Sequence, residues 1–136
     1  MPTTGTATYS IEEWDEKDIE SFPDGSKWAR SRVTQSYCGE ITGSAVSESV
    51  LFYRPDGTSD FVTLERIDGA IGGRTGTVVF RHVGTYDGTV ARSTFKVVPQ
   101  SGTEGLTGMS GSGNFMADKA GLVEIDIEYE FDGDTA

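Results

Sequence analysis

Three polar side chains, Glu65, His82 and Ser93, fall at positions that their neighbours mark as the inner face of a sheet. A histidine beside a carboxylate and a hydroxyl can take up and release protons, and these residue types serve as acids, bases and nucleophiles in enzymes. A buried charge is costly unless it is paired. This trio is therefore the part of the sequence whose residue types and spacing best fit a chemical role.

The segment that contains the trio, residues 61–98, is predicted to form three antiparallel strands joined by tight turns at Gly72–Gly73 and Asp87–Gly88. Both dipeptides suit two-residue hairpin turns, whose central residues need positive φ. Fixed turns fix the register and hence the face of every side chain. The predicted opposed pairs are Glu65–Phe80, Thr63–His82, His82–Ser93, Phe80–Phe95 and Val78–Val97.

A third turn extends this ribbon toward the N-terminus. The residues Arg54-Pro55-Asp56-Gly57 form a strong turn signal, with proline and glycine at the positions that favour them. This turn predicts Leu51 opposite Phe61, Ser49 opposite Thr63 and Ser47 opposite Glu65.

One inner layer of the ribbon would then hold only small or polar residues, which leaves room, so we expect a cavity. The candidate catalytic residues are Glu65 and His82, and the candidate ligand-binding residues are Ser49, Tyr53, Phe61, Thr63, Phe80, Ser93 and Phe95.

Alternating apolar residues predict four further strands. Their ranges are residues 6–14, 28–38, 113–117 and 122–131. The strand that leads into the turn at Arg54 is a separate one, the third of the chain, and covers residues 41–54. The acidic segment 12–23 is interpreted as a loop over the barrel end, and the glycine-rich segment 100–112 as a long connection. No positive-φ pair fixes the register of the strand at 28–38, so Arg30 and Arg32 could point inward or outward.

The composition fits a single all-β domain over residues 1–136. The chain has 18 glycines and few prolines, its apolar residues recur in short runs, and no stretch keeps a helical period for long. Eight strands in sequence, joined mostly by short turns, close most simply into an eight-stranded antiparallel β-barrel without exposed edges.

The net charge of −11 argues against nucleic acid and against an anionic membrane surface as partners. The polar start of the sequence does not have the form of a secretory signal, and no apolar run is long enough to span a membrane, so we expect a cytoplasmic protein. One cysteine and one histidine make a zinc site within one chain improbable, and no cofactor is expected.

The outer face of the predicted central strands is unusually apolar. Its apolar side chains are Val46, Val50, Phe52, Val62, Leu64, Val79 and Val83. Monomers rarely leave a patch of this size exposed to water, so we expect a homo-oligomer, most simply a dimer.

Five stretches of the chain resemble the bacterial family called domain of unknown function 3224. They are WDEK at 14–17, YRPDGTSDFVTLERIDG at 53–69, GRTGTVVFRHVGTYDG at 73–88, ARSTFKVVPQSGTEGLTGMSGSGNF at 91–115 and the closing IDIEYEF. The resemblance covers essentially the whole chain. It implies the fold of the allene oxide cyclase-like barrels, which have eight strands and are often oligomeric. It does not imply an activity, and no motif allows the cyclase's catalytic residues to be assigned here.

Three functions remain open from the residues alone. The first is a barrel that binds a small, mostly apolar organic molecule, and the second is a cofactor-independent isomerase or cyclase with Glu65 and His82 as acid and base. The third is a structural or regulatory oligomer in which the trio is only a satisfied buried network. A Ser–His–Glu hydrolase is disfavoured, because strand interiors offer neither an exposed nucleophile nor a free oxyanion hole.

Overall fold

The computed structural model describes residues 2–117 and 123–132, which form a closed barrel of eight antiparallel strands in sequential order. The strands are β1 (Thr3–Ser21), β2 (Lys27–Gly39), β3 (Ile41–Tyr53), β4 (Ser59–Ile71), β5 (Arg74–Tyr86), β6 (Ala91–Val97), β7 (Met109–Ala117) and β8 (Val123–Phe131), with a 3-10 helix η1 (Glu104–Leu106) before β7. The predicted all-β fold and eight-stranded barrel are confirmed. Among the described residues, no helix has the length and apolar character needed to cross a membrane.

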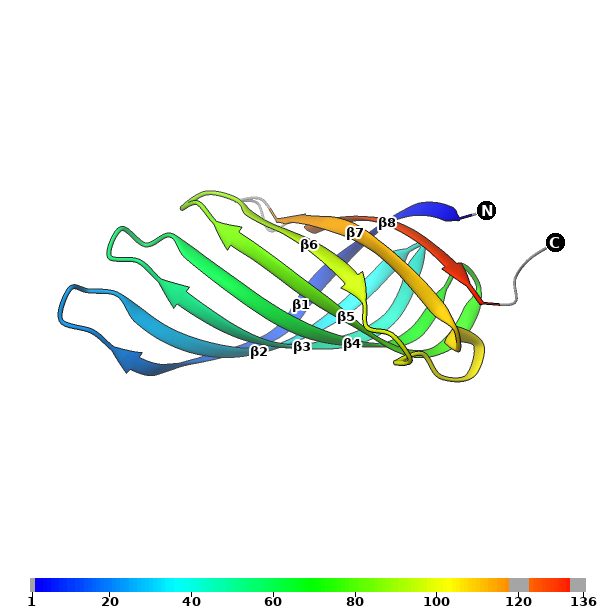
Figure 1. Cartoon of the computed structure of the whole chain (residues 1–136), viewed down its shortest axis with the longest axis horizontal. Coiled ribbons are helices and arrows are strands. Elements are labelled where there is room, and N and C mark those ends of the chain that lie inside the picture. The colour runs from blue at the N-terminus through cyan, green and yellow to red at the C-terminus, as the bar shows by residue number, and fades with distance from the viewer. Residues whose placement is uncertain (1, 118–122, 133–136) are drawn as a thin grey trace.

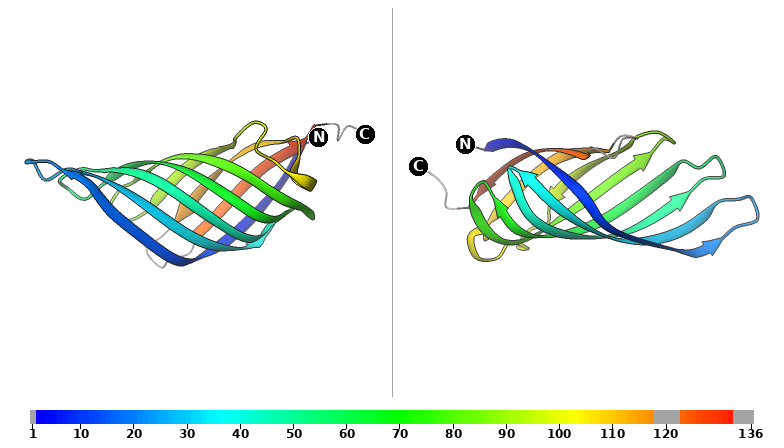
Figure 2. Two further views of the ribbon diagram at one scale, coloured as in Figure 1. Left: turned by 90° about the horizontal axis from the view of Figure 1, so that it is seen from below. Right: turned by 180° about the vertical axis from the view of Figure 1, so that it is seen from behind.

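The two ends of the barrel differ in shape. The β1–β2, β3–β4 and β5–β6 turns project at one end, whereas the start of β1, the end of β8 and the β4–β5 turn lie at the other (Figure 1). The β1–β2 hairpin reaches farthest, and the same staggered outline is visible from below and from behind (Figure 2). We call the first end the open end and the second the closed end.

The turns around β4 fix the register as predicted. Gly72 and Gly73 have φ values of 60° and 84°, which a residue with a Cβ would adopt only at a cost. The predicted pairs across β3–β4 and β4–β5 are all present: Leu51–Phe61, Ser49–Thr63, Ser47–Glu65, Glu65–Phe80 and Thr63–His82.

The predicted register between β5 and β6 is wrong by two residues. Instead of a two-residue turn, a four-residue loop at 87–90 joins Tyr86 to Ala91. The Asp87 Oδ1 atom accepts hydrogen bonds from the backbone N–H groups of Thr89 (2.9 Å) and Val90 (2.8 Å), which closes the longer loop. The observed pairs are therefore Phe80–Val97, His82–Phe95 and Gly84–Ser93. A shift of two residues keeps each side chain on its face, so Ser93 and Phe95 still point inward.

The acidic segment 12–23 is not a loop, as the sequence had led us to expect. β1 continues through it to Ser21. Among the described residues only Thr3 to Tyr9 pair with β8, and the rest of β1 pairs with β2 alone as an edge strand. Carboxylates along an exposed edge discourage pairing with other chains. The acidic composition therefore reflects an edge strand and not an irregular segment.

Other boundaries differ less from the predictions. β7 starts at Met109, and the connection at 98–108 contains η1, whose Leu106 is fully buried. Of the predicted last strand, Leu122 lies outside the described residues. In β2, Arg30 and Arg32 point outward, near Glu48, so the alternate residues face the interior.

The closed half of the barrel is filled by one apolar cluster. Phe80 and Phe95 stack at its centre with ring centroids 4.8 Å apart, and they expose 0% and 1% of their surface. The inward side chains of β8 belong to the same cluster, apart from Val123. Burial of this cluster supplies the main hydrophobic contribution to folding.

Candidate functional site

A cavity of about 470 Å³ occupies the open half of the barrel, and all eight strands contribute to its wall. Its lining combines aromatic and aliphatic side chains with hydroxyls. The lining residues are Tyr9, Ile11, Trp14, Ser31, Val33, Gln35, Ser47, Ser49, Leu51, Tyr53, Ser59, Phe61, Thr63, Glu65, His82, Tyr86, Thr89, Ala91, Ser93, Phe115, Ala117 and Val123.

Glu65 forms the polar centre of the cavity floor. It is 1% exposed, and its Oε1 atom lies 2.8 Å from His82 Nε2. Its Oε2 atom accepts hydrogen bonds from the Tyr37 hydroxyl at 2.5 Å and from Gln35 Nε2 at 3.3 Å. Both oxygens of this buried carboxylate are therefore hydrogen-bonded, which offsets the cost of removing it from water.

His82 links Glu65 to Ser93. The second ring nitrogen, Nδ1, lies 3.1 Å from Ser93 Oγ, and the His82 side chain is 8% exposed. In the neutral ring, Nε2 carries the proton and donates a hydrogen bond to Glu65, while Nδ1 accepts a hydrogen bond from the Ser93 hydroxyl. When the ring is protonated, it donates a hydrogen bond to both partners. The imidazole can thus move a proton between the serine hydroxyl and the buried carboxylate.

A second set of hydrogen bonds extends the floor toward β2 and β3. Ser47 Oγ donates to Gln35 Oε1 at 2.7 Å, which orients the Gln35 amide so that its nitrogen faces Glu65. The hydroxyls of Ser49 and Thr63 lie 2.6 Å apart on neighbouring strands. In the described part of the chain, no buried side-chain nitrogen or oxygen lacks a hydrogen-bond partner.

Two tyrosines are held in their neutral form at this floor. Burial raises the pKa of the Tyr37 phenol well above its usual value, and the nearby Glu65 carboxylate raises it further. Burial and the same carboxylate also raise the pKa of Tyr9. Both phenols therefore remain hydrogen-bond donors across the physiological range.

Aromatic rings surround the polar floor on the side of β1 and β7. Tyr9 packs edge-on against Tyr37, with ring centroids 5.1 Å apart, and is nearly parallel to Phe115 at 6.2 Å. Across the cavity, Phe61 uses the space above Gly84, where a Cβ atom would lie 2.6 Å from the ring. Such a wall suits a flat or compact apolar molecule.

A β-bulge brings Trp14 into the cavity wall. The pairing of β1 with β2 skips a residue between Ile11 and Glu13, so Trp14 lies opposite the inward-facing Val33. Simple alternation from Ile11 would have placed Trp14 on the outer face. The indole is 56% exposed and lies at the rim of the cavity.

The structure brings most of the candidate residues together. Seven of them line the cavity: Ser49, Tyr53, Phe61, Thr63, Glu65, His82 and Ser93. Phe80 and Phe95, which we expected in the wall, lie beneath it instead, because they stack on each other inside the filled half.

Sequence reasoning missed Gln35 and Tyr37, since the register of β2 was open. A usable signal was present, because between residues 28 and 38 one face carries Arg30 and Arg32 whereas the other carries no formal charge.

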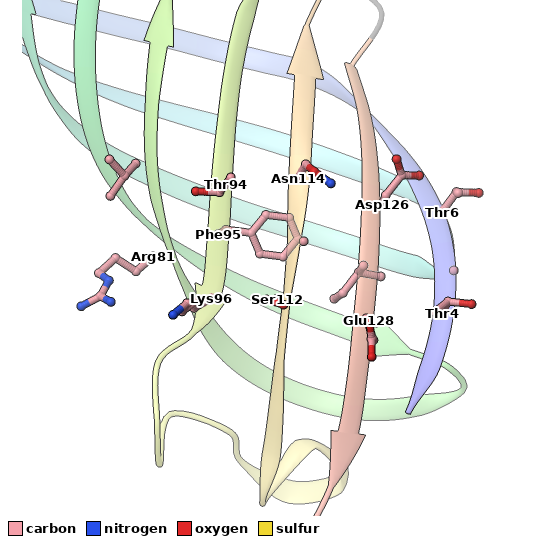
Figure 3. A pocket seen from close by; sticks show the side chains of 14 residues that line it. Thr4, Thr6, Arg81, Thr94, Phe95, Lys96, Ser112, Asn114, Asp126 and Glu128 are labelled. Carbon is pink, nitrogen blue, oxygen red and sulfur yellow. The ribbon is translucent and has the colours of Figure 1, made fainter. Parts of the chain in front are cut away.

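No group of three or more His, Cys, Asp or Glu residues that could hold a metal ion occurs among the described residues. A second hollow, of about 630 Å³, lies on the outside of the barrel over β5–β8 and the start of β1. Threonine, serine and asparagine side chains line it, between Arg81 and Lys96 on one side and Asp126 and Glu128 on the other (Figure 3). Only the interior cavity contains a buried, hydrogen-bonded carboxylate–imidazole pair, so it is the candidate functional site.

A closed antiparallel barrel with a hollow half and a buried polar floor defines the class of this protein. Residues 5–129 match the family described as "Protein of unknown function (DUF3224)", and the chain belongs to this family. The crystal structure of a protein of unknown function from the DUF3224 family of Shewanella oneidensis MR-1 is similar, with a TM-score of 0.77, 22% sequence identity, and coverage of 97% of this chain and 99% of that one. This similarity shows the fold alone. No curated protein gives a significant match.

Proposed function

We propose that this protein binds a small, uncharged and mostly apolar organic molecule in the open half of the barrel. The observation that carries the proposal is the cavity of about 470 Å³, whose apolar walls end on the Glu65–His82 pair. Ligand pockets in proteins have volumes of about 300–1,000 Å³ and combine apolar walls with a few fixed polar groups. The cavity fits this description in both size and lining.

The charges around the cavity favour a neutral ligand. The projecting part of β1, residues 12–20, carries six carboxylates and one lysine, so it repels an anion that approaches the open end. Inside, Glu65 is 1% exposed and already accepts hydrogen bonds from three side chains, so a cation could contact it only by displacing one of them. The groups left for a ligand are mainly hydroxyls, which suit a carbonyl or an alcohol, and His82 Nδ1, which a ligand can reach by taking the place of Ser93.

A second candidate function is a cofactor-independent isomerase or cyclase that acts on such a molecule. The contacts of His82 with Glu65 and Ser93 favour it, because a bound carbonyl compound that takes the place of Ser93 at Nδ1 can give a proton to this nitrogen and receive it back at another carbon, while Glu65 stabilises the protonated ring. The cavity would also hold a flexible substrate in a reactive shape. We also propose that the barrel is of the allene oxide cyclase-like type and that the protein is cytoplasmic.

A series of compounds with one carbon skeleton tests binding. We expect menthone and menthol to raise the thermal midpoint of the wild-type protein, whereas the corresponding carboxylic acid and amine do not. His82→Ala should remove these shifts while the barrel stays folded. Arg81→Ala, which changes the adjacent but outward-facing residue of β5, is the matched control and should keep them. No shift with any compound, or equal shifts in wild type and His82→Ala, would refute binding at this site.

The catalytic alternative has its own readout. In deuterated water, an acid–base enzyme should speed the exchange of the α-hydrogens of menthone, and His82→Ala should abolish that acceleration. Binding without accelerated exchange would leave the binder and exclude this activity on ketones of that class.

A further inference from the structure

The outer face of β2–β5 exposes a contiguous patch of large apolar side chains, which we call the apolar patch. Its members expose between 37% and 56% of their surface and are Trp28, Val50, Phe52, Val62, Leu64 and Val83. Val62 lies directly opposite Val50 on one side and Val83 on the other, so this row of the patch crosses three strands without a gap, whereas Leu64 lies between Glu48 and Arg81. Patches of this kind mark interaction surfaces on soluble proteins.

The opposite side of the barrel has a different outer face. Among the described residues of β6–β8, Met116 is the only large apolar residue that is exposed. Its neighbours are polar or charged: Arg92 and Glu124 lie directly opposite Met116 on the two adjacent strands. The side chains of Thr94, Asn114 and Asp126 continue this polar face (Figure 3). The apolar patch is therefore a property of one side and not of the barrel as a whole.

The charges at the ends of the patch are complementary to each other. Along the outer face of β4, the order is Asp60, Val62, Leu64 and Arg66, and all four side chains are exposed. Consider a second copy whose outer face packs against this one, related by a two-fold axis that lies between the two faces, perpendicular to β4 and level with Thr63. The order of the four residues is then reversed on the second copy. This arrangement places Val62 against the partner's Leu64 and Asp60 against the partner's Arg66.

We propose that the apolar patch is the interface of a symmetric homodimer in which the β4 strands of the two barrels face each other in opposite directions. A two-fold interface must be self-complementary, and this series of residues is. Asp60 also pairs with Arg54 of its own chain at 2.9 Å, but an exposed pair of this kind contributes little and does not compete strongly. An anionic membrane does not fit, because the chain has a net charge of −11.

The dimer would support the cavity without blocking it. Glu65 and Thr63 lie on β4 between the proposed interface residues, with their side chains pointing into the barrel. The interface thus lies behind the wall of β3–β5 that carries the polar floor, and the turns at the open end stay free (Figure 1).

Measurement of the mass in solution tests the interface. We expect light scattering at tens of micromolar to give twice the chain mass for wild type and the single chain mass for Leu64→Glu, with unchanged circular dichroism. Met116→Glu, which places the same charge on an exposed apolar site of the other side, should remain dimeric. A monomeric wild type, or Leu64→Glu that remains dimeric, would overturn the proposal, and so would loss of the dimer in Met116→Glu.

Exchange of the charges tests the geometry. Asp60→Arg and Arg66→Asp should each weaken self-association at least tenfold, because each places like charges opposite one another twice. An equimolar mixture of the two variants should form the heterodimer, since both contacts are again of opposite charge. If the mixture stays as weakly associated as the separate variants, this arrangement of β4 strands is wrong.

Discussion

The two halves of this barrel share the same eight strands but differ in the volume of their inward side chains. In the closed half, Ile67, Val78 and Phe80 leave no exposed surface. In the open half, the same strands carry hydroxyl residues such as Ser49 and Thr63 around a cavity of about 470 Å³. An eight-stranded barrel is just wide enough for side chains to fill it. Alternation therefore decides which residues face inward, and their size decides whether a layer stabilises the fold or leaves space for a ligand.

The Glu65–His82 pair lies where the two halves meet. Below it, the Phe80 and Phe95 rings exclude water. The centroids of the His82 and Phe95 rings are 5.0 Å apart. Above it, the hydroxyl groups of Ser93 and Thr63 open onto the cavity. This position gives the pair a buried, weakly hydrated environment on one side and access to a ligand on the other.

The largest expected difference between the halves concerns aromatic residues. Phe80→Ala should lower the free energy of unfolding by about 3–5 kcal/mol, the usual cost of removing a fully buried phenylalanine. Phe61→Ala should cost roughly 1 kcal/mol, because Phe61 already borders empty space. Urea unfolding of both variants measures the two values. Equal costs would mean that the open half is as well packed as the closed half.

The buried pair should show a smaller, but non-additive, effect. Glu65→Leu should cost about 3 kcal/mol, because it leaves polar groups of His82 and Tyr37 without their partner. Adding His82→Phe removes one of these unpaired groups and should recover part of that loss. The double variant should nevertheless fail to bind menthone. A double variant less stable than the sum of the two single changes would contradict this account of the pair.

The same substitution at two alanines tests packing directly. Ala45→Leu adds volume to the filled cluster and should cost about 1–3 kcal/mol, whereas Ala91→Leu points into the cavity and should change stability by no more than about 0.5 kcal/mol. Thermal unfolding with calorimetry compares them. A larger loss at Ala91 than at Ala45 would reverse the assignment of the halves.

The smallest expected effect is at alkaline pH. The pKa of Tyr37 is raised in the folded state, so its contribution to stability is complete below the pKa of an unfolded tyrosine, about 10, and is lost as the pH rises beyond it. In the closed half, burial and Glu40 raise the pKa of Tyr129 to about 12. The urea concentration at the unfolding midpoint should decrease as the pH rises above about 10. This decrease should be less steep for Tyr37→Phe than for wild type. An equally steep decrease for Tyr37→Phe would exclude Tyr37 as a source of this pH dependence.

Where the sequence contained a defined turn, the fold could be predicted residue by residue. Gly72–Gly73 and the turn after Arg54 tolerate few alternatives, so the pairs around Thr63 and Glu65 followed correctly. The Asp87 loop was misjudged because Asp-Gly also suits longer loops in which the aspartate side chain binds backbone N–H groups. Because the error was an even number of residues, the inward face was still correct.

Features that depend on neighbouring strands could not be predicted in this way. The bulge before Glu13 reverses which residues of β1 face inward, and no local signal marks it, so Trp14 was missed. Whether an inward aromatic lines a cavity or fills a core depends on what packs above it. Phe61 and Phe80 look alike in the alternating pattern, yet only Phe61 borders the cavity.

A crystal structure of the protein with menthone bound tests the central claim most directly. The account predicts menthone inside the open half, with its ring between Tyr9 and Phe61 and its carbonyl oxygen within hydrogen-bonding distance of His82 or Ser93. Menthone found only in the second hollow, on the outside of the barrel beside Thr94, would contradict it. So would an open half filled by side chains at saturating menthone.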